Sequence, residues 1–204
     1  HVDILATDIN PVMLEIAKRE LDDVAGLEFQ LADALDLTFP DFHFTTVICQ
    51  FGIMFFPDKR RALSEMLRVL RPGGKVYVST WSELAQSHVF NRAHQAVQSL
   101  DLMAPVNFIG GYSYSHADDI RSDFLAAGFD QIELSTVTKM AAAPTIDFLV
   151  DGVVNGTTIA SQLDEQGMLA AGTQAIREQL ISAFGEDKPS GQVQALFCIA
   201  ARPQ

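Results

Sequence analysis

Two aspartates, Asp8 and Asp33, each follow a predicted strand, at positions where a carboxylate could bind a nucleoside. Asp8 follows the apolar run 2–7, and Asp33 follows a second run, 27–32. In an open parallel sheet, ligands bind beyond the carboxyl ends of the strands. An acid after one strand can accept hydrogen bonds from both ribose hydroxyls, and an acid after the next can meet an adenine amino group. The pair predicts an adenosine pocket, although an aspartate ahead of a helix is about as often only a cap.

Alternating strand and helix patterns position these two residues. Asn10-Pro11 starts a helix that runs to about residue 22, Pro57-Asp58 starts another, and Pro72-Gly73-Gly74 ends the second. Strands are predicted at 2–7, 27–32, 45–51, 75–81, 131–138 and 193–201. Further helices are predicted at 83–104, 145–155 and 161–184, and a capping box at 115–118 opens one that ends at Gly128. This order predicts an α/β fold with a parallel sheet covered on both faces.

Composition excludes several classes of function. The chain has 204 residues, enough for one domain, with 14 basic and 26 acidic side chains and a net charge of -12. Such a field repels nucleic acid and anionic membrane surfaces. No apolar run reaches the roughly 18 residues of a membrane span. The two cysteines, Cys49 and Cys198, form no disulfide framework, which favours a cytoplasmic protein, and no spacing suits a metal site.

Other reactive side chains have a plain structural interpretation that is stronger than the chemical one. The candidates for a general base are three histidines, and those for lining a substrate site are two tyrosines in a Gly/Ser loop: His88, His94, His116, Tyr112 and Tyr114. An apolar patch follows the third strand, and one or two of its members could line an acceptor pocket although core packing explains most of it: Phe51, Met54, Phe55 and Phe56. Both cysteines read as small core residues.

Four segments in this order and spacing resemble the class I S-adenosylmethionine-dependent methyltransferases. They are residues 7–14 (TDINPVML), 31–34 (LADA), 50–58 (QFGIMFFPD) and 67–75 (LRVLRPGGK), and the stretch 125–129 (LAAGF) extends the match. The branch that they resemble is the small-molecule group that includes the ubiquinone and menaquinone biosynthesis enzymes. The resemblance implies a Rossmann-like, mostly parallel sheet with an antiparallel last strand. It also implies one domain, 1–204, in which segments 83–115 and 139–190 cover the substrate.

The resemblance further implies a cofactor, S-adenosylmethionine, and an in-line methyl transfer to a small-molecule acceptor. Asp8 would bind the ribose hydroxyls, with Ile9 and Met13 beside the adenine. Asp33 would accept from the adenine amino group, and the Ala34 amide would meet a ring nitrogen. Gln50 and Phe51 would face the methionine moiety and the methyl group. No catalytic residue is assigned, because the methyl is already activated and a base is needed only if the acceptor must lose a proton.

One departure from the pattern concerns the glycine-rich loop that holds the carboxypropyl end of the cofactor. Dinucleotide folds place their acid about 20 residues after that loop, so the loop belonging to Asp8 would lie ahead of His1. We therefore expect a domain truncated at its N-terminus, with impaired cofactor binding and two open strand edges. Two alternatives remain, a nicotinamide-dependent oxidoreductase and a non-catalytic interaction module. Asp33 and Pro72-Gly73-Gly74 favour the methyltransferase over the oxidoreductase.

Overall fold

The computed structural model describes residues 3–21, 23–107 and 110–204, and it contains two sheets. In the smaller sheet β1 (Ile4–Asp8) pairs in parallel with β2 (Leu27–Leu31), and α1 (Pro11–Glu20) connects them. The larger sheet has the order β3-β4-β6-β5, formed by β3 (Phe44–Gln50), β4 (Leu70–Trp81), β6 (Ser190–Ala201) and β5 (Asp130–Ala142). Strands β3 and β4 are parallel, and β6 is antiparallel to both its neighbours. The predicted α/β fold with an antiparallel last strand is confirmed.

The main apolar core lies on one face of the four-stranded sheet. Side chains that alternate along the strands, such as Val76, Val78 and Cys198, pack against α2 (Lys59–Val69) and α4 (Ala117–Ala127). On the opposite face Ile48 is 70% exposed, and Tyr77 and Phe197 are each 38% exposed. Helices α2 and α4 therefore cover one face of this sheet, as predicted. The predicted cover of the other face is not seen at Ile48, Tyr77 and Phe197.

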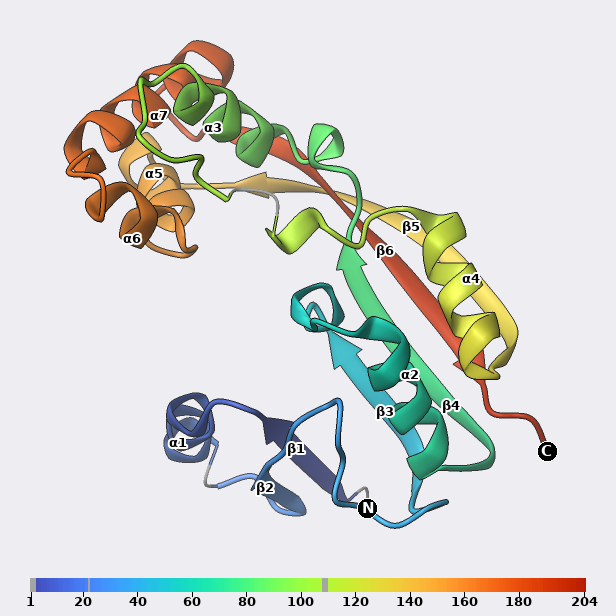
Figure 1. Cartoon of the computed structure of the whole chain (residues 1–204). Helices are drawn as coiled ribbons and strands as arrows, with labels where there is room; N and C mark the ends of the chain where they lie inside the picture. Colours follow the sequence, from blue (N-terminus) through green and yellow to red (C-terminus); the bar gives the residue numbers. More distant parts are fainter. Residues whose placement is uncertain (1–2, 22, 108–109) are drawn as a thin grey trace.

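A second apolar core lies in a helical unit at the far end of β5 and β6 (Figure 1). It is formed by α3 (His88–Gln98), α5 (Ile146–Val154), α6 (Ile159–Asp164) and α7 (Leu169–Phe184). Its fully buried side chains include Leu163, Ile176 and Leu180. All four helices belong to the two segments predicted to cover the substrate, 83–115 and 139–190. These two segments therefore come together in space.

Several predicted boundaries were wrong. Helix α2 ends at Val69, and Pro72-Gly73-Gly74 lies inside β4 as an irregularity, where the pairing with β3 jumps from Leu70 to Lys75. The stretch 83–104 forms the short 3₁₀ helix η2 (Leu84–Gln86) and then α3, and 161–184 is divided at Gly167, whose φ is +66°. The residue that caps α4 is His116, with no side-chain cap bond, so the capping box at 115–118 was wrong.

The remaining elements are two single-turn 3₁₀ helices, η1 (Ile53–Phe55) and η3 (Gly110–Tyr112). The predicted start of the first strand at Val2, the end of the first helix near Asp22 and part of the loop at 107–115 lie outside the described residues. Over the described ranges, none of the helices has the length and apolar character needed to cross a membrane.

Strands β1 and β3 are edge strands of the smaller and the larger sheet. No ladder joins β1 to β3 among the described residues, and Figure 1 shows them running in the same direction on either side of an opening. The Phe51 N–H donates to the Ser79 carbonyl on the β4 side, so by alternation the backbone groups of Ile48 point to the open side. The Ile4 N–H donates to Gly26 on the β2 side, which leaves Leu5 and Thr7 pointing to the opening. Among the described residues, β1 and β3 are thus unpaired on these sides.

Open edges with exposed apolar side chains are templates for pairing with another chain. We expect the 204-residue chain to elute in size-exclusion chromatography with light scattering as a dimer or larger species. Ile48→Lys places a charge on the β3 edge and should shift the chain toward monomer. Phe148→Lys is the matched control, since Phe148 is 64% exposed on α5, away from both edges, and it should leave the distribution unchanged. A stable wild-type monomer would contradict this expectation.

Candidate functional site

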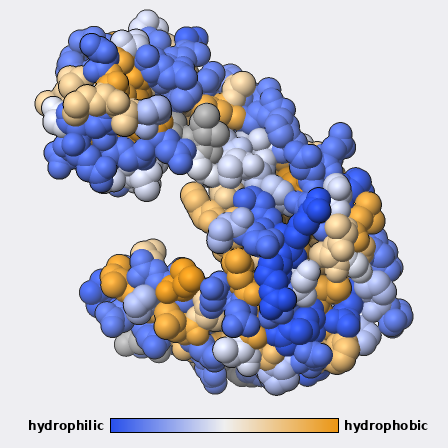
Figure 2. All heavy atoms as spheres, viewed as in Figure 1, coloured by the Kyte–Doolittle hydropathy of each residue, from blue (hydrophilic) through white to orange (hydrophobic). Residues whose placement is uncertain are grey.

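The carboxyl ends of β1, β3 and β4 face the hollow of the molecule. Figure 2 shows this hollow between the helical unit and the smaller unit formed by α1, β1 and β2. The predicted site residues lie on two of the parts that surround it: those around Asp8 and Asp33 on the smaller unit, and those around Phe51 on the larger sheet.

Asp8 ends β1 and shapes the turn into α1. Its Oδ1 accepts from the Asn10 N–H at 2.8 Å, and the Asn10 side chain in turn accepts from the Val12 N–H at 3.0 Å and caps α1. Beside it Ile9 and Met13 are 65% and 51% exposed. One carboxylate oxygen of Asp8 therefore stabilises the helix start, while the second makes no hydrogen bond among the described residues.

Asp33 occupies the equivalent place after β2. Its Oδ1 accepts from the Leu35 N–H at 2.9 Å, and Ala34 beside it is half-buried. The Ala32 N–H donates to the Asp8 carbonyl at 3.1 Å, which joins the two strand ends directly. The structure thus brings Asp8 and Asp33 together at one edge, each with a carboxylate oxygen left over from its local hydrogen bond.

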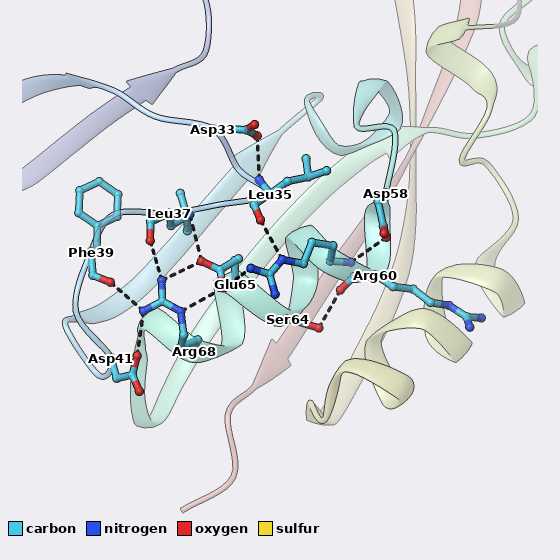
Figure 3. A network of polar contacts seen from close by, with 11 residues as sticks. Asp33, Leu35, Leu37, Phe39, Asp41, Asp58, Arg60, Ser64, Glu65 and Arg68 are labelled. Carbon is cyan, nitrogen blue, oxygen red and sulfur yellow. Dashed lines mark hydrogen bonds and ion pairs between the residues drawn. The ribbon is translucent and has the colours of Figure 1, made fainter.

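A polar network on α2 holds the loop that carries Asp33 (Figure 3). The Arg68 guanidinium donates to both oxygens of Glu65, at 3.1 and 2.7 Å, and to the carbonyls of Leu37 and Phe39, at 2.7 Å each. It also pairs with Asp41 at 2.8 Å. We call Arg68 and Glu65 the loop clamp.

Glu65 and the neighbouring Arg61 complete this attachment. The buried Glu65 carboxylate accepts from the Leu37 N–H at 3.0 Å, and the Arg61 Nε donates to the Leu35 carbonyl at 2.9 Å. The hydrogen bonds from Arg68 lower the pKa of Glu65 below its ordinary value, in spite of burial. Sequence reasoning gave Arg68 no role, although it lies in the segment 67–75 that carried the resemblance.

The third strand end has an unusual backbone. Phe51 has φ +50°, a left-handed value that is uncommon for a bulky residue, and its N–H donates to the carbonyl and the hydroxyl of Ser79, at 3.0 and 3.2 Å. Its ring stacks on Trp81 with centroids 4.4 Å apart. Gln50 beside it is exposed. No ladder joins this strand end to that of Asp8 in the described part of the chain.

The two tyrosines proposed as substrate contacts are both buried. The Tyr114 hydroxyl donates to Asp123 at 3.1 Å, and its backbone carbonyl accepts from Thr80, so it is fixed in the core; burial raises its pKa. Tyr112 is 8% exposed and lies 6.5 Å from Trp81, between ring centroids. Burial raises the pKa of Tyr112 to about 12, so at neutral pH it is a hydrogen-bond donor and not a base.

The histidines and cysteines are not gathered at the strand ends. His88 lines a pocket of about 330 Å³ between α3 and the end of α7, and His116 pairs with Glu83 at 3.6 Å on the surface. Burial lowers the pKa of His94 on α3. Burial also raises the pKa of both thiols, that of Cys198 to about 12, so neither is a ready nucleophile. Within the described residues no group of three potential ligands is placed for a metal ion.

Comparison with known proteins decides the family. A family model described as a methyltransferase domain matches residues 1–78. A ubiquinone/menaquinone biosynthesis C-methyltransferase of Pseudomonas fluorescens is 34% identical over 150 residues, which are 67% of this chain and 59% of that protein. The chain belongs to the class I methyltransferase family. The methyltransferase tpcH of Aspergillus fumigatus is 28% identical over 146 residues, 69% of this chain and 52% of that protein.

Solved structures agree on the methyltransferase fold. The YcgJ protein of Bacillus subtilis gives a TM-score of 0.63 at 15% identity, over 99% of this chain and 83% of that one. A phosphoethanolamine N-methyltransferase of Haemonchus contortus, solved with S-adenosyl-L-methionine, gives 0.58 at 18% identity, over 99% of this chain and 44% of that one. The chain spans 52% to 60% of the length of the first curated relatives it matches.

The loop clamp of this methyltransferase domain gives a prediction on stability. Arg68→Ala leaves the buried Glu65 carboxylate without its main partner and removes the donors to two loop carbonyls. We expect it to lower the free energy of unfolding by about 2–3 kcal/mol, slightly less than for a fully buried pair because the Arg68 side chain is 30% exposed. Urea unfolding measures this. The matched control is Arg92→Ala on the exposed side of α3, expected within about 0.5 kcal/mol of wild type; equal losses in both variants would contradict the clamp.

The lowered pKa of Glu65 predicts a pH dependence of stability. A carboxyl whose folded pKa lies below its unfolded value, about 4.3, stabilises the fold above that value. This contribution is lost as the pH falls through the folded pKa. We therefore expect the difference in unfolding free energy between wild type and Glu65→Gln to be constant from about pH 7 to 5 and to shrink below about pH 4. A difference that does not change between pH 7 and 3 would show that the Glu65 charge does not stabilise the fold.

Proposed function

We propose that this chain transfers a methyl group from S-adenosylmethionine to a small-molecule acceptor. The observation that carries the proposal is the placement of Asp8 and Asp33 at the joined ends of β1 and β2. Each carboxylate uses Oδ1 for a local hydrogen bond and, among the described residues, makes none through its second oxygen. Membership of the methyltransferase family supports the same cofactor. A cytoplasmic location is part of the proposal, since both cysteines are free thiols and a reducing compartment keeps them so.

In this proposal each side of the hollow holds one part of the cofactor. The free oxygen of Asp8 accepts from the ribose hydroxyls, and the exposed side chains of Ile9 and Met13 cover the adenine. Asp33 accepts from the adenine amino group, and the Ala34 N–H donates to a ring nitrogen. On the other side of the hollow, Gln50 and Phe51 face the end of the cofactor that carries the methyl group.

When bound, S-adenosylmethionine supplies a methyl group already activated on a sulfonium, so the transfer is an in-line displacement. The task of the chain is then to align the acceptor with that group and to exclude water. Phe51, Trp81 and Tyr112 provide an apolar wall for this. We assign no general base, because the methyl group is already activated and a base is needed only if the acceptor must lose a proton.

We also propose that the 204-residue chain by itself binds the cofactor weakly. Asp8 and Asp33 suit the adenosine half of the cofactor. The described turn from β1 into α1, however, contains no glycine. A glycine-rich turn at a helix N-terminus is what commonly lets backbone N–H groups approach an anionic group closely. The carboxypropyl end of the cofactor therefore has less support than the adenosine.

Isothermal titration with S-adenosylhomocysteine and with NAD⁺ tests the proposal. We expect S-adenosylhomocysteine to bind with an affinity weaker than low-micromolar and NAD⁺ not to bind. Asp8→Asn keeps the oxygen that accepts from Asn10 but loses the charge, so it should weaken binding by about tenfold with no loss of stability. Asp164→Asn, on the exposed side of α6, is the control. Low-micromolar affinity would contradict the weak binding, and binding of NAD⁺ or an unaffected Asp8→Asn variant would contradict the assigned site.

A further inference from the structure

The turn that carries Asp33 is closed by its own hydrogen bonds. The Asp36 N–H donates to the Asp33 carbonyl at 3.1 Å. The Leu35 N–H donates to Asp33 Oδ1 at 2.9 Å, as Figure 3 shows. An aspartate at the first position of a turn commonly accepts from the N–H two residues later. These two bonds fix the direction of the carboxylate relative to the turn 33–36, but they do not fix where the turn lies relative to the larger sheet.

Arg61 on α2 ties this turn to the larger sheet. Its Nε donates to the Leu35 carbonyl at 2.9 Å, and its Nη2 lies 3.5 Å from Glu65 Oε1. The backbone of Arg61 is itself fixed, because its N–H donates to the capping carboxylate of Asp58 at 2.9 Å. Leu35 is thus held on two sides, since its N–H donates to Asp33 and its carbonyl accepts from Arg61.

Arg61 differs from the loop clamp in the place where it acts. The clamp, formed by Arg68 and Glu65, holds the loop from residue 37 to residue 41. Arg61 reaches the turn itself, two residues after Asp33. The Arg61 side chain is 52% exposed, and exposed ion pairs contribute little to stability. The main effect of this contact is therefore on the position of the turn and not on the stability of the fold.

We propose that Arg61 is a positioning residue, which places the Asp33 carboxylate opposite the adenine amino group of the cofactor. This inference rests on the proposed function and names a residue that determines its preference for adenine. Arg61 acts through Leu35 and does not itself touch the cofactor in this role. A hydrogen bond to an amino group needs a distance of about 2.7–3.2 Å and a nearly linear geometry. A small displacement of the turn therefore loses this bond, while the apolar contacts of the base persist.

Two ligands that differ at one position of the purine test this role. S-adenosylhomocysteine carries an amino group there, and S-inosylhomocysteine carries a carbonyl oxygen, which a carboxylate repels. An NMR titration of the wild-type chain, which measures weak affinities, should show at least a tenfold preference for the adenosyl compound, because hydrogen bonds to charged groups are strong. Asp33→Asn keeps the oxygen that accepts from Leu35 and presents an N–H₂ group to the base, so it should remove or reverse this preference.

Arg61→Met keeps an unbranched apolar side chain but removes the donors and the charge. We expect it to weaken binding of the adenosyl compound about tenfold and to leave binding of the inosyl compound within twofold of wild type, so that the preference falls at least fivefold. The midpoint of urea unfolding should not change. Arg60→Met is the matched control, since Arg60 is exposed and pairs with Asp123 on α4. It removes the same charge one residue away and should keep the preference.

The outcomes separate this inference from the proposed function. If Asp33→Asn loses the preference and Arg61→Met keeps it, the proposed cofactor site stands and Arg61 has no positioning role. Equal weakening of both ligands in Arg61→Met, or an equal loss of preference in Arg60→Met, would also overturn the positioning role, because a general effect on the fold or on charge would then explain the result. If the wild-type chain shows no preference, the adenine contact of Asp33 is wrong, and the role of Arg61 with it.

Discussion

The arrangement of the candidate site depends on the hydrogen bonds of one arginine. No ladder connects β1 to β3 in the described residues, so the smaller sheet is attached to the larger one through the loop between β2 and β3 and the hydrogen bonds of this loop to α2. Arg68 makes most of that attachment, with bonds to Glu65, Asp41 and two loop carbonyls. A lysine could not reproduce it, because only the planar guanidinium presents five donors in a fixed geometry.

This attachment is polar, and its physical consequence is position more than stability. Burying the Glu65 carboxylate costs desolvation energy that its bonds to Arg68 and Leu37 offset, and such buried pairs add little net stability by themselves. They do fix the path of the loop, which carries Asp33 at one end. The carboxylates on the smaller sheet and the stacked rings of Phe51 and Trp81 on the larger one are therefore linked through α2, the element that contacts the loop and also packs in the main core.

The sequence was most informative where a residue type has a local cause. Asn10 caps α1 as predicted, and α2 starts after Asp58 and α4 ends at Gly128 as expected, because helix ends are decided by a few neighbouring residues. The loop clamp could not be predicted from the sequence. Arg68 binds the loop residues Leu37, Phe39 and Asp41, which lie 27 to 31 positions earlier in the chain. The strain at Phe51 was equally hidden, because it follows from a stack on Trp81, 30 residues away.

The two aspartates show why a cap and a ligand contact could not be told apart from the sequence. Each uses Oδ1 to accept from the N–H two residues later, at 2.8 and 2.9 Å, as an ordinary turn residue does. A carboxylate has two oxygens, so the local bond also fixes the direction of the remaining one. The structural role therefore does not compete with the proposed binding role. By orienting the second oxygen before a ligand arrives, the turn removes part of the ordering cost of binding.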